Sequence, residues 1–304
     1  MASEEKIAPA ITIRVLTTHH DLRACEEIQR LTWNMVERDI VPMHLLVAVN
    51  LHGGLVLGAE TEERLVGFLF GYPGWLPPDD PRREGLEVPF FHASQMLGVL
   101  PEYQDRGIGY LLKLKQREMV LEQGFQLIMW TYDPLLSRNA HFNIARLGAI
   151  SRRYLRNLYD ELPGLNAGLP TDRLEVEWWI ASQRVRKRLA GADRGVANRR
   201  AAGEYPLNPS IPRPDGLRAP AASFHPPDEL RALVEIPGDF QALKAVDMGL
   251  AQAWRAHIRE VLEAAFAAGY VITGFTSQVE EGTRRSYYIL TREAELSVTG
   301  RGSE

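Results

Sequence analysis

The sequence predicts an α/β protein with a mixed sheet, followed by a second αβ part toward the C-terminal end. Two observations lead to this fold class. Apolar runs of strand type alternate with helix-periodic stretches over residues 11–182, in the order β, α, α, β, β, β, α, β, α, β, β. Strand and helix patterns then return after a Pro-, Gly- and Ala-rich segment with little periodicity. The expected organisation is a first domain at 1–185, a linking or wrapping segment at 186–228, a C-terminal αβ subdomain at 229–296 and a disordered tail at 297–304.

The first part of the chain is expected to hold two helical stretches among four strands. Residues 11–16 alternate apolar and polar side chains, which is typical of a half-buried strand. Asp21 stands where a capping residue precedes a helix over 22–34, and Pro42 interrupts a second helical stretch over 36–46. The elements expected next are a hairpin of strands at 55–60 and 65–72, a proline-rich loop at 73–89 and a strand at 90–100.

Glycines mark the ends of the two helices expected in the middle of the chain. One helix covers 107–122 and stops before Gly124, and a short one over 139–147 follows the capping residue Ser137 and stops at Gly148. The strands expected around the short helix are 126–132, 149–155 and 173–180, and a basic, solvated helix face is expected at 184–188.

The C-terminal part has the layout of residues 93–132, namely strand, proline, helix, glycine and strand. Its expected elements are a strand at 230–236, a helix at 240–268 and strands at 270–278 and 286–291. The glycines of a phosphate loop are absent from it. Two interpretations stay open, a degenerate half-repeat of the first domain and an unrelated αβ extension.

The composition excludes several classes of function. Apolar residues make up 45% of the 304 residues, which suffices for real cores, and the net charge of −4 gives no reason to expect nucleic acid or an anionic membrane. The single Cys25 excludes an internal disulfide and a cysteine-based metal cluster. The N-terminus lacks the apolar core of a signal peptide, and no apolar run approaches about 18 residues. We therefore expect a cytoplasmic protein without nucleic-acid or membrane partners.

The most informative segment is residues 97–109, with the sequence Leu-Gly-Val-Leu-Pro-Glu-Tyr-Gln-Asp-Arg-Gly-Ile-Gly. A strand-type run stops at a proline, a loop with two glycines follows, and a helix-periodic run begins at once. Gly107 and Gly109 remove Cβ atoms where the backbone must approach an anion. The first turn of the helix offers unpaired N–H groups and the positive end of its dipole. This order predicts a diphosphate site.

Two common phosphate-binding designs do not fit this segment. A P-loop requires Gly-Lys-Ser/Thr at its end, whereas Tyr110 and Leu111 follow Gly109. A dinucleotide-binding loop requires a third glycine, where this chain has Leu112, and an acidic residue about 20 residues on at a strand end. Glu122 lies near that distance but inside a helix.

The segment resembles the acyl-CoA-binding motif of the GNAT acyltransferase superfamily, in which Val-x-Pro-x-x and Gln/Arg-x-x-Gly-x-Gly/Ala join a strand to a helix. The residues at the motif positions are Val99, Pro101, Gln104, Gly107 and Gly109. The order of elements over 11–182 also matches the GNAT order. The resemblance implies a GNAT-type acyltransferase fold, with acetyl-CoA or another acyl-CoA as co-substrate and no metal.

Two further stretches, 133–140 and 147–149, are similar to an uncharacterised bacterial GNAT subgroup with an extended C-terminal part. This likeness implies acylation of amino acids from succinyl-CoA or acetyl-CoA. An acidic acyl group or an amino-acid carboxylate requires a cation, and arginine suits carboxylates. The arginines expected near the acyl group are Arg138, Arg152, Arg153 and Arg156.

The resemblance also implies which residues contact the co-substrate. The strand before the loop holds the pantetheine and polarises the thioester carbonyl, the loop binds the diphosphate, and the short helix contacts the pantetheine arm. The cofactor-binding residues expected are Leu97, Gly98, Val99, Gln104, Asp105, Arg106, Gly107, Ile108, Gly109, Tyr110, Asn139 and Asn143.

The catalytic groups depart from the pattern of the family. Many members place a carboxylate on the strand before the loop and a tyrosine in the short helix, but this chain has no such carboxylate and has Ile144 at the tyrosine position. His92 is the candidate general base because an unperturbed imidazole titrates near neutrality, and Glu60 is an alternative. Tyr132, Tyr154 and His141 are the candidate acids, and the position of Tyr132 at the end of a strand favours it.

The sequence therefore predicts an N-acyltransferase that moves an acetyl or succinyl group from CoA to a small-molecule amine, such as an amino acid, by direct transfer. Two other interpretations stay open, a non-catalytic acyl-CoA sensor or scaffold, and a ligase or kinase that uses ATP. A homodimer also stays open.

Overall fold

The structure is a computed structural model that describes residues 10–62, 64–160, 168–191, 200, 204–280 and 282–292. By compactness the chain divides into two units, Met1–Ile128 and Met129–Glu304. This division lies inside the predicted first domain rather than at its end. The predicted tail at 297–304 lies outside the described residues, as does part of the predicted linking segment.

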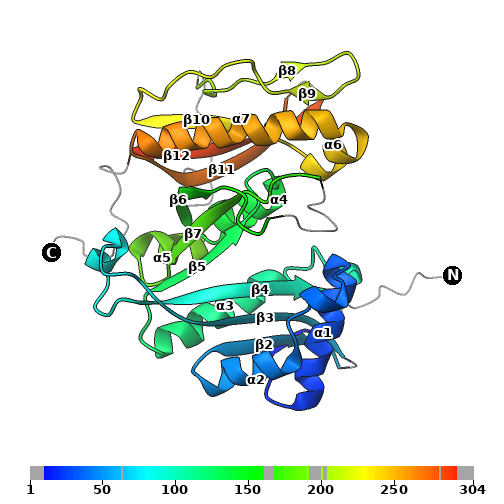
Figure 1. The fold of residues 1–304 in the computed structure, drawn as a ribbon. Helices are drawn as coiled ribbons and strands as arrows, with labels where there is room; N and C mark the ends of the chain where they lie inside the picture. Colours follow the sequence, from blue (N-terminus) through cyan, green and yellow to red (C-terminus); the bar gives the residue numbers. More distant parts are fainter. Residues whose placement is uncertain are drawn as a thin grey trace. The chain divides into compact units, whose positions relative to one another are not determined.

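The first unit contains an antiparallel sheet in the order β1-β2-β3-β4 (Figure 1). Its strands are β1 (Thr12–Val15), β2 (Leu55–Glu60), β3 (Leu65–Trp75) and β4 (Phe90–Val99). Short 3-10 turns follow α1, β3 and β4: η1 (Glu37–Asp39), η2 (Pro81–Gly85) and η3 (Pro101–Tyr103). All four strands lie within a few residues of their predicted positions.

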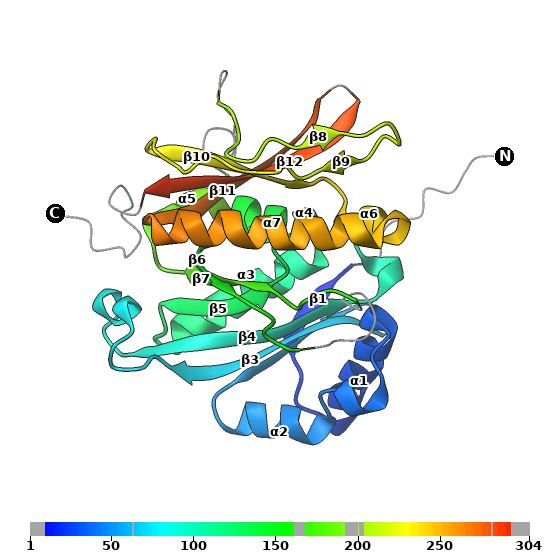
Figure 2. The ribbon, with the colours of Figure 1, turned by 45° about the horizontal axis from the view of Figure 1, so that its top comes forward.

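Helices cover both faces of this sheet. They are α1 (His19–Trp33), α2 (Met43–Leu51) and α3 (Ile108–Glu122). Consecutive strand residues point to opposite faces. A Cβ added at Gly67 would lie against Ile108 of α3, whereas the neighbouring Phe68 packs edge-on against Trp33 of α1. Figure 2 shows α1 and α3 on the two sides of β3 and β4.

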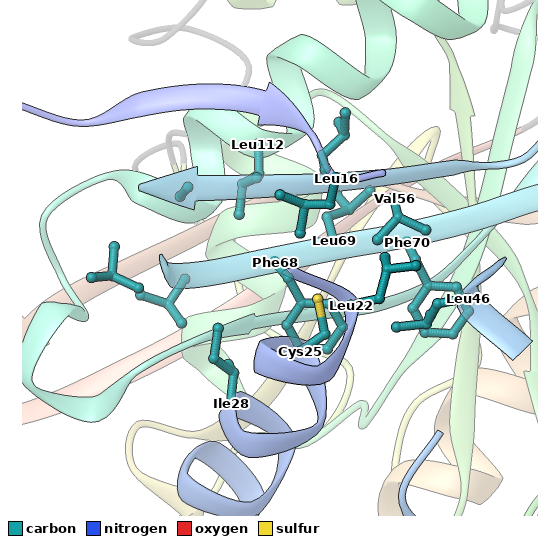
Figure 3. Packing of buried hydrophobic residues seen from close by; sticks show 14 of the residues in the cluster. Leu16, Leu22, Cys25, Ile28, Leu46, Val56, Phe68, Leu69, Phe70 and Leu112 are labelled. Carbon is teal, nitrogen blue, oxygen red and sulfur yellow. The ribbon is translucent and has the colours of Figure 1, made fainter. Parts of the chain in front are cut away.

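The core of the first unit contains the single cysteine (Figure 3). Cys25 is fully buried among Leu22, Ile28 and Phe68, as a small apolar residue would be. Burial raises the pKa of its thiol to about 12, so the thiol stays protonated and unreactive at neutral pH. Leu112 of α3 packs on the opposite side of the strands.

The N-terminal cap of α1 differs from the prediction. Thr18 caps the helix, because its hydroxyl accepts a hydrogen bond from the backbone N–H of Asp21 at 3.2 Å. The Asp21 side chain instead receives Arg14, with N···O distances of 2.8 and 2.9 Å. Arg14 also binds Glu60 at 2.6 Å and lowers the pKa of both carboxyls. Glu60 is therefore held as an ion pair.

The second unit contains a sheet in the order β5-β7-β6-β11-β12-β10. Its strands are β5 (Leu127–Tyr132, which begins in the first unit), β6 (Ile150–Leu155), β7 (Arg173–Trp179), β10 (Arg231–Pro237), β11 (Tyr270–Glu280) and β12 (Thr283–Arg292). β12 pairs antiparallel with both β10 and β11. A two-stranded ribbon, β8 (Ile211–Pro212) with β9 (Arg218–Ala219), lies in the predicted wrapping segment.

The helices of the second unit are short except for the last. They are α4 (Ser137–Ala140), a π-helical turn η4 (His141–Arg146), α5 (Gln183–Leu189), α6 (Phe240–Val246) and α7 (Met248–Ala267). α7 packs against β6, β10 and β11, and both views show it lying along the last three strands. The single helix predicted at 240–268 is two helices, since Asp247 leaves the helical conformation and caps α7.

The predicted α/β class, the order of elements and the αβ extension are confirmed. Besides the cap of α1 and the helix at 240–268, two further local predictions were wrong. Ser137 does not cap α4 but donates a hydrogen bond to the Gly238 carbonyl at 2.6 Å. The basic stretch 184–188 is not simply solvated, because Arg184 and Arg188 donate to the carbonyls of Gly148 and Ala145 at 3.1 and 2.7 Å. No described helix is long and apolar enough to cross a membrane.

Candidate functional site

The loop between β4 and α3 has the backbone that its glycine predicts. Gly107 has φ +80°, in the left-handed region that favours glycine, and Asp105 adopts φ +61°. A Cβ added at Gly107 would meet no described atom within 4 Å. The space above this residue is therefore open to a ligand.

The N-terminus of α3 lies at the end of this loop. Gly107 is its N-cap and supplies no side-chain cap, and the first turn of the helix lacks an acidic residue. The first N–H groups of a helix have no partner inside the helix, and the dipole places about half a positive charge there. An anion can therefore bind here through backbone N–H groups, of which Ile108 and Gly109 supply the first two.

Hydrogen bonds hold the loop in this conformation. The Gln104 amide donates to the Val99 carbonyl at 3.0 Å, which ties the loop to the end of β4. Arg106 donates to the Glu102 carbonyl at 2.8 Å. The predicted contacts of Gln104, Asp105, Arg106 and Tyr110 with CoA stay predictions, and for Gln104 the structure adds a role in positioning the loop.

The ring of Tyr103 carries two guanidinium groups. Arg64 lies 5.6 Å and Arg106 5.0 Å from the ring centroid. Arg64 also forms an ion pair with Glu102 at 2.5 Å, whereas Arg106 is exposed and bonds only a backbone carbonyl among its described contacts. Arg106 thus adds a positive charge to the loop and forms no ion pair among the described contacts, although its charge helps to lower the pKa of Glu102.

β4 contains a β-bulge before the loop. Phe70 pairs with Met96 and Gly71 with Ser94, so Gln95 is the extra residue on β4. A bulge bends a strand and re-aims the residues around it. Leu97, Gly98 and Val99 follow the bulge and pair regularly with β3; their predicted contacts with pantetheine stay predictions.

His92 lies on the same strand but is not poised to titrate near neutrality. Its side chain is fully buried, and neither ring nitrogen has a described hydrogen-bond partner. Burial, followed by the nearby Lys113, lowers its pKa to about 3. The expectation of a near-neutral pKa is therefore wrong, because burial and the neighbouring Lys113 both disfavour the charged imidazolium.

Sequence reasoning missed the buried polar group beside His92. Lys113 of α3 donates to Ser94 at 2.8 Å and to Gln116 at 3.1 Å, and burial lowers its pKa well below the usual value. A lysine in a helix reads as a solvated residue, and only the helical spacing of Lys113 and Gln116 with the apolar face could have suggested burial.

The second unit holds the other predicted catalytic residues. The Tyr132 hydroxyl donates to Tyr288 at 3.1 Å, and Tyr288 donates to the Pro134 carbonyl at 2.8 Å. Burial raises the pKa of both phenols, so both stay protonated at neutral pH. Tyr288 comes from β12 and was not predicted from the sequence.

His141 lies at the start of the π-helical turn, with its ring 6.4 Å from that of Phe275. Burial of part of its ring, together with Arg146 and Arg284, lowers its pKa. Asn143 is buried on the same turn and accepts a hydrogen bond from the Trp130 indole at 3.3 Å. π-helical turns are frequent at functional sites because they re-aim side chains.

Asn139 is half-buried on α4, one turn before Asn143. The predicted roles of both asparagines, of Tyr132 and of His141 stay predictions. In the first unit the loop residues follow one end of β4, whereas His92 lies near its other end. Tyr132, Asn143 and His141 lie in the second unit.

Three of the four arginines expected to receive a carboxylate already have one. Their partners are Glu177 for Arg152 at 3.0 Å, Glu175 for Arg153 at 3.1 Å and Glu263 for Arg156 at 2.5 Å. An arginine paired with a protein carboxylate offers a weaker site to a substrate carboxylate. Glu263 belongs to the extension, which explains why its pairing could not be foreseen.

Comparisons with known proteins give structural matches only. No protein-family model matches the sequence, and no curated protein matches it. Solved structures do match, among them a GNAT-family protein from Desulfovibrio desulfuricans (17% identity, 57% of this chain and 100% of that one, TM-score 0.44). Others are a ribosomal-protein-alanine N-acetyltransferase from Escherichia coli (16%, 56% and 94%, 0.43) and an Arabidopsis thaliana protein solved with acetyl-CoA (15%, 56% and 99%, 0.45).

Proposed function

We propose that this protein is an acyl-CoA-dependent N-acyltransferase that moves an acetyl or succinyl group to a small-molecule amine. The observation that carries the proposal is the uncapped N-terminus of α3, reached through a loop in which Gly107 has a positive φ and open space above it. Backbone N–H groups there suit the diphosphate of CoA. The loop has neither the lysine nor the hydroxyl that an ATP-binding P-loop requires.

The reaction needs a neutral amine. The amine nitrogen attacks the thioester carbonyl, a C–N bond forms, the C–S bond breaks, and the CoA thiolate leaves with the electron pair. The acylated nitrogen loses one proton, which passes through water to the thiolate, so the products are the amide and CoA. The thiolate has an ordinary pKa of about 8.5, so it can leave without a dedicated acid. In the proposal Tyr132, which stays protonated, exchanges its hydrogen bond to Tyr288 for one to the departing sulfur.

Neither candidate base is placed to remove a proton from the acceptor amine. His92 is fully buried, and Glu60 is paired with Arg14. We therefore expect the acceptor to react from the fraction that is already deprotonated. The value of kcat/KM should rise about tenfold per pH unit until the pKa of the acceptor amine is reached, and a plateau set near pH 7 by the enzyme would contradict this scheme.

A second candidate is a non-catalytic acyl-CoA sensor. It is favoured by the same buried state of His92, which leaves no titrating group on β4 in the described residues. Release of free CoA from acetyl-CoA or succinyl-CoA in the presence of amines separates the two candidates, since a sensor would bind the thioester and release none.

The test of the binding site is thermal unfolding with CoA, acetyl-CoA, succinyl-CoA, ATP and NAD, for the wild type and for Gly107→Glu. A ligand that binds only the native state raises the midpoint. We expect the CoA species to raise the midpoint of the wild type and to leave that of Gly107→Glu unchanged.

The matched control is Gly269→Glu. Gly269 also has a positive φ, +77°, with no described atom within 4 Å of an added Cβ, but it follows α7 rather than preceding α3. It should lower stability to a similar extent and keep the response to CoA. A folded wild type that responds to ATP and not to CoA would overturn the proposal.

A further inference from the structure

A buried group of cations lies at the end of β5 in the second unit. Arg255 of α7 donates to Asp133 at 2.5 Å, and Arg173 of β7 lies 3.9 Å from the same carboxylate. Lys244 of α6 is close enough to Asp133 and Arg255 for their charges to affect its pKa, which burial lowers. These residues, Asp133, Arg173, Lys244 and Arg255, are named the Asp133 cluster.

Arg255 has donors that the described protein does not use. The residue is 2% exposed, and neither its Nε nor its Nη1 has a hydrogen-bond partner among the described residues. An arginine remains charged inside a protein, and a buried donor that is left unpaired destabilises the folded state. The structure therefore contains an arginine that is prepared for an acceptor beyond Asp133.

The charges of the cluster are also unbalanced. Two arginines, Arg173 and Arg255, face the carboxylate of Asp133, which already accepts the backbone N–H of Leu135 at 2.9 Å. The buried Asp172 is itself bound on both oxygens by Arg259 at 2.9 Å. Buried charges are normally paired, so these two arginines can accommodate a further anion.

The surroundings of the cluster fit an organic anion. The Arg255 guanidinium lies 5.5 Å from the centre of the Phe240 ring, and that of Arg173 lies 5.4 Å from the Tyr159 ring. Tyr159 is 45% exposed, so this side of the cluster reaches solvent. Asp133 directly follows Tyr132, the residue proposed to face the leaving sulfur.

We propose that the Asp133 cluster binds a carboxylate of the substrate pair, with Arg255 as its main donor and Arg173 and Lys244 as supporting charges. The inference rests on the proposed acyltransfer for the identity of the ligand. The carboxylate has two sources, the α-carboxylate of an amino-acid acceptor and the distal carboxylate of a succinyl donor. In both cases the C-terminal extension, through α6 and α7, supplies the determinant of specificity.

Direct binding tests the site without any acyl transfer. Succinate should raise the unfolding midpoint of the wild type, whereas succinamide, the uncharged isostere, should not at matched ionic strength. Arg255→Met should abolish the response. The matched control is Arg213→Met, which removes a half-exposed arginine of the same unit that pairs with Asp247; it should keep the response.

Kinetics identify the source of the carboxylate. With acetyl-CoA and a responsive amino acid, Arg255→Met should raise KM at least tenfold and leave KM for the corresponding amino-acid amide unchanged if the acceptor supplies the carboxylate. If the donor supplies it, the same variant should lower kcat/KM for succinyl-CoA at least tenfold and spare acetyl-CoA. Lys244→Met, on the outer side of the cluster, should show the same pattern with a smaller change.

Two results overturn the inference. One is a wild type that binds CoA thioesters but responds equally to succinate and succinamide, which would leave the proposed function intact. The other is a folded Arg255→Met or Lys244→Met protein with unchanged responses to every carboxylate. If no CoA species binds, the proposed function fails, while the succinate response still decides whether the cluster binds carboxylates.

Discussion

Two of the strand-to-helix transitions in the chain, β10 to α6 and β4 to α3, differ in one respect. β10 leads into α6 through Asp239, whose side chain accepts the N–H of Ala242 at 3.0 Å, and α7 is capped by Asp247 in the same way at 2.9 Å. β4 leads into α3 through Gly107, and no described side chain caps it. The C-terminal helices thus carry their own anion, whereas α3 is left to receive one from a ligand. Under the proposed function, this difference separates a helix start that is closed by its own side chain from one that a ligand would complete.

The largest expected effect comes from giving α3 the cap that it lacks. Asparagine and aspartate both tolerate a positive φ, so Gly107→Asn and Gly107→Asp differ mainly in charge. We expect Gly107→Asp to weaken acetyl-CoA binding at least 100-fold, about 2.7 kcal/mol, and Gly107→Asn by less than tenfold. Isothermal titration measures both. If both variants lose the same affinity for acetyl-CoA, the added side chain weakens binding through its size and not through its charge.

The second effect concerns the strands that precede the helices. β10 buries Glu235 against Arg285 at 2.6 Å, whereas β4 buries His92 without a partner. The folded pKa of His92, about 3, lies below its ordinary 6.5, so protonation favours the unfolded chain. The neutral His92 side chain therefore contributes fully to the free energy of unfolding above pH 6.5, and this contribution is lost as the pH falls toward 3.

Between pH 6.5 and pH 5 this loss amounts to about 2 kcal/mol, or 1.4 kcal/mol per pH unit. His92→Leu should lack the corresponding slope. Urea unfolding of both proteins at a series of pH values gives the difference. A constant difference in the free energy of unfolding from pH 8 to pH 5 would mean that His92 has an ordinary pKa in the folded protein.

A smaller effect is expected at the capped helix. Asp239→Ala should lower the free energy of unfolding by about 1 kcal/mol, because the N–H of Ala242 loses its acceptor, whereas Asp239→Asn should keep most of it. CoA binding should be unchanged in both. Denaturant unfolding checks the first statement and titration the second; weaker CoA binding in Asp239→Asn would break the distinction between the two helix starts.

The smallest effect is expected at the two arginines on Tyr103. Arg106→Gln should weaken CoA binding about threefold and reduce its dependence on salt, since the residue is exposed and its charge is screened. Arg64→Gln should have no such effect, because Glu102 already neutralises Arg64. Titrations at two salt concentrations compare the variants. Identical salt dependence in both would remove Arg106 from the anion site.

Local sequence was sufficient to predict the loop and most elements. The strand, the left-handed glycine and the helix of the anion site lie within a few residues of one another, and their conformations follow from short-range preferences. The ends of helices were predicted less accurately. Thr18 caps α1 instead of Asp21, and Asp247 divides a helix that was predicted to be continuous.

The Asp133 cluster could not be predicted because its parts are far apart in the sequence. Arg255 and Asp133 are separated by 122 positions, and nothing near either residue indicates the other. The burial of His92 and Lys113 was missed for a related reason, since their residue types favour exposure and only tertiary packing overrides that preference. The partner of a buried charged or polar residue is set by the tertiary fold, not by the sequence around that residue.

The pairing of α7 with the ends of β5 and β7 also bears on how such a chain can change during evolution. Arg255 and Arg259 reach Asp133 and Asp172, both buried, so deletion of the extension would leave two carboxylates without their partners. Removing one partner of a buried ion pair costs about 3–5 kcal/mol. Loss of the last third of the chain would therefore require compensating changes at both aspartates, and descendants of this protein are expected to retain or lose all four residues together.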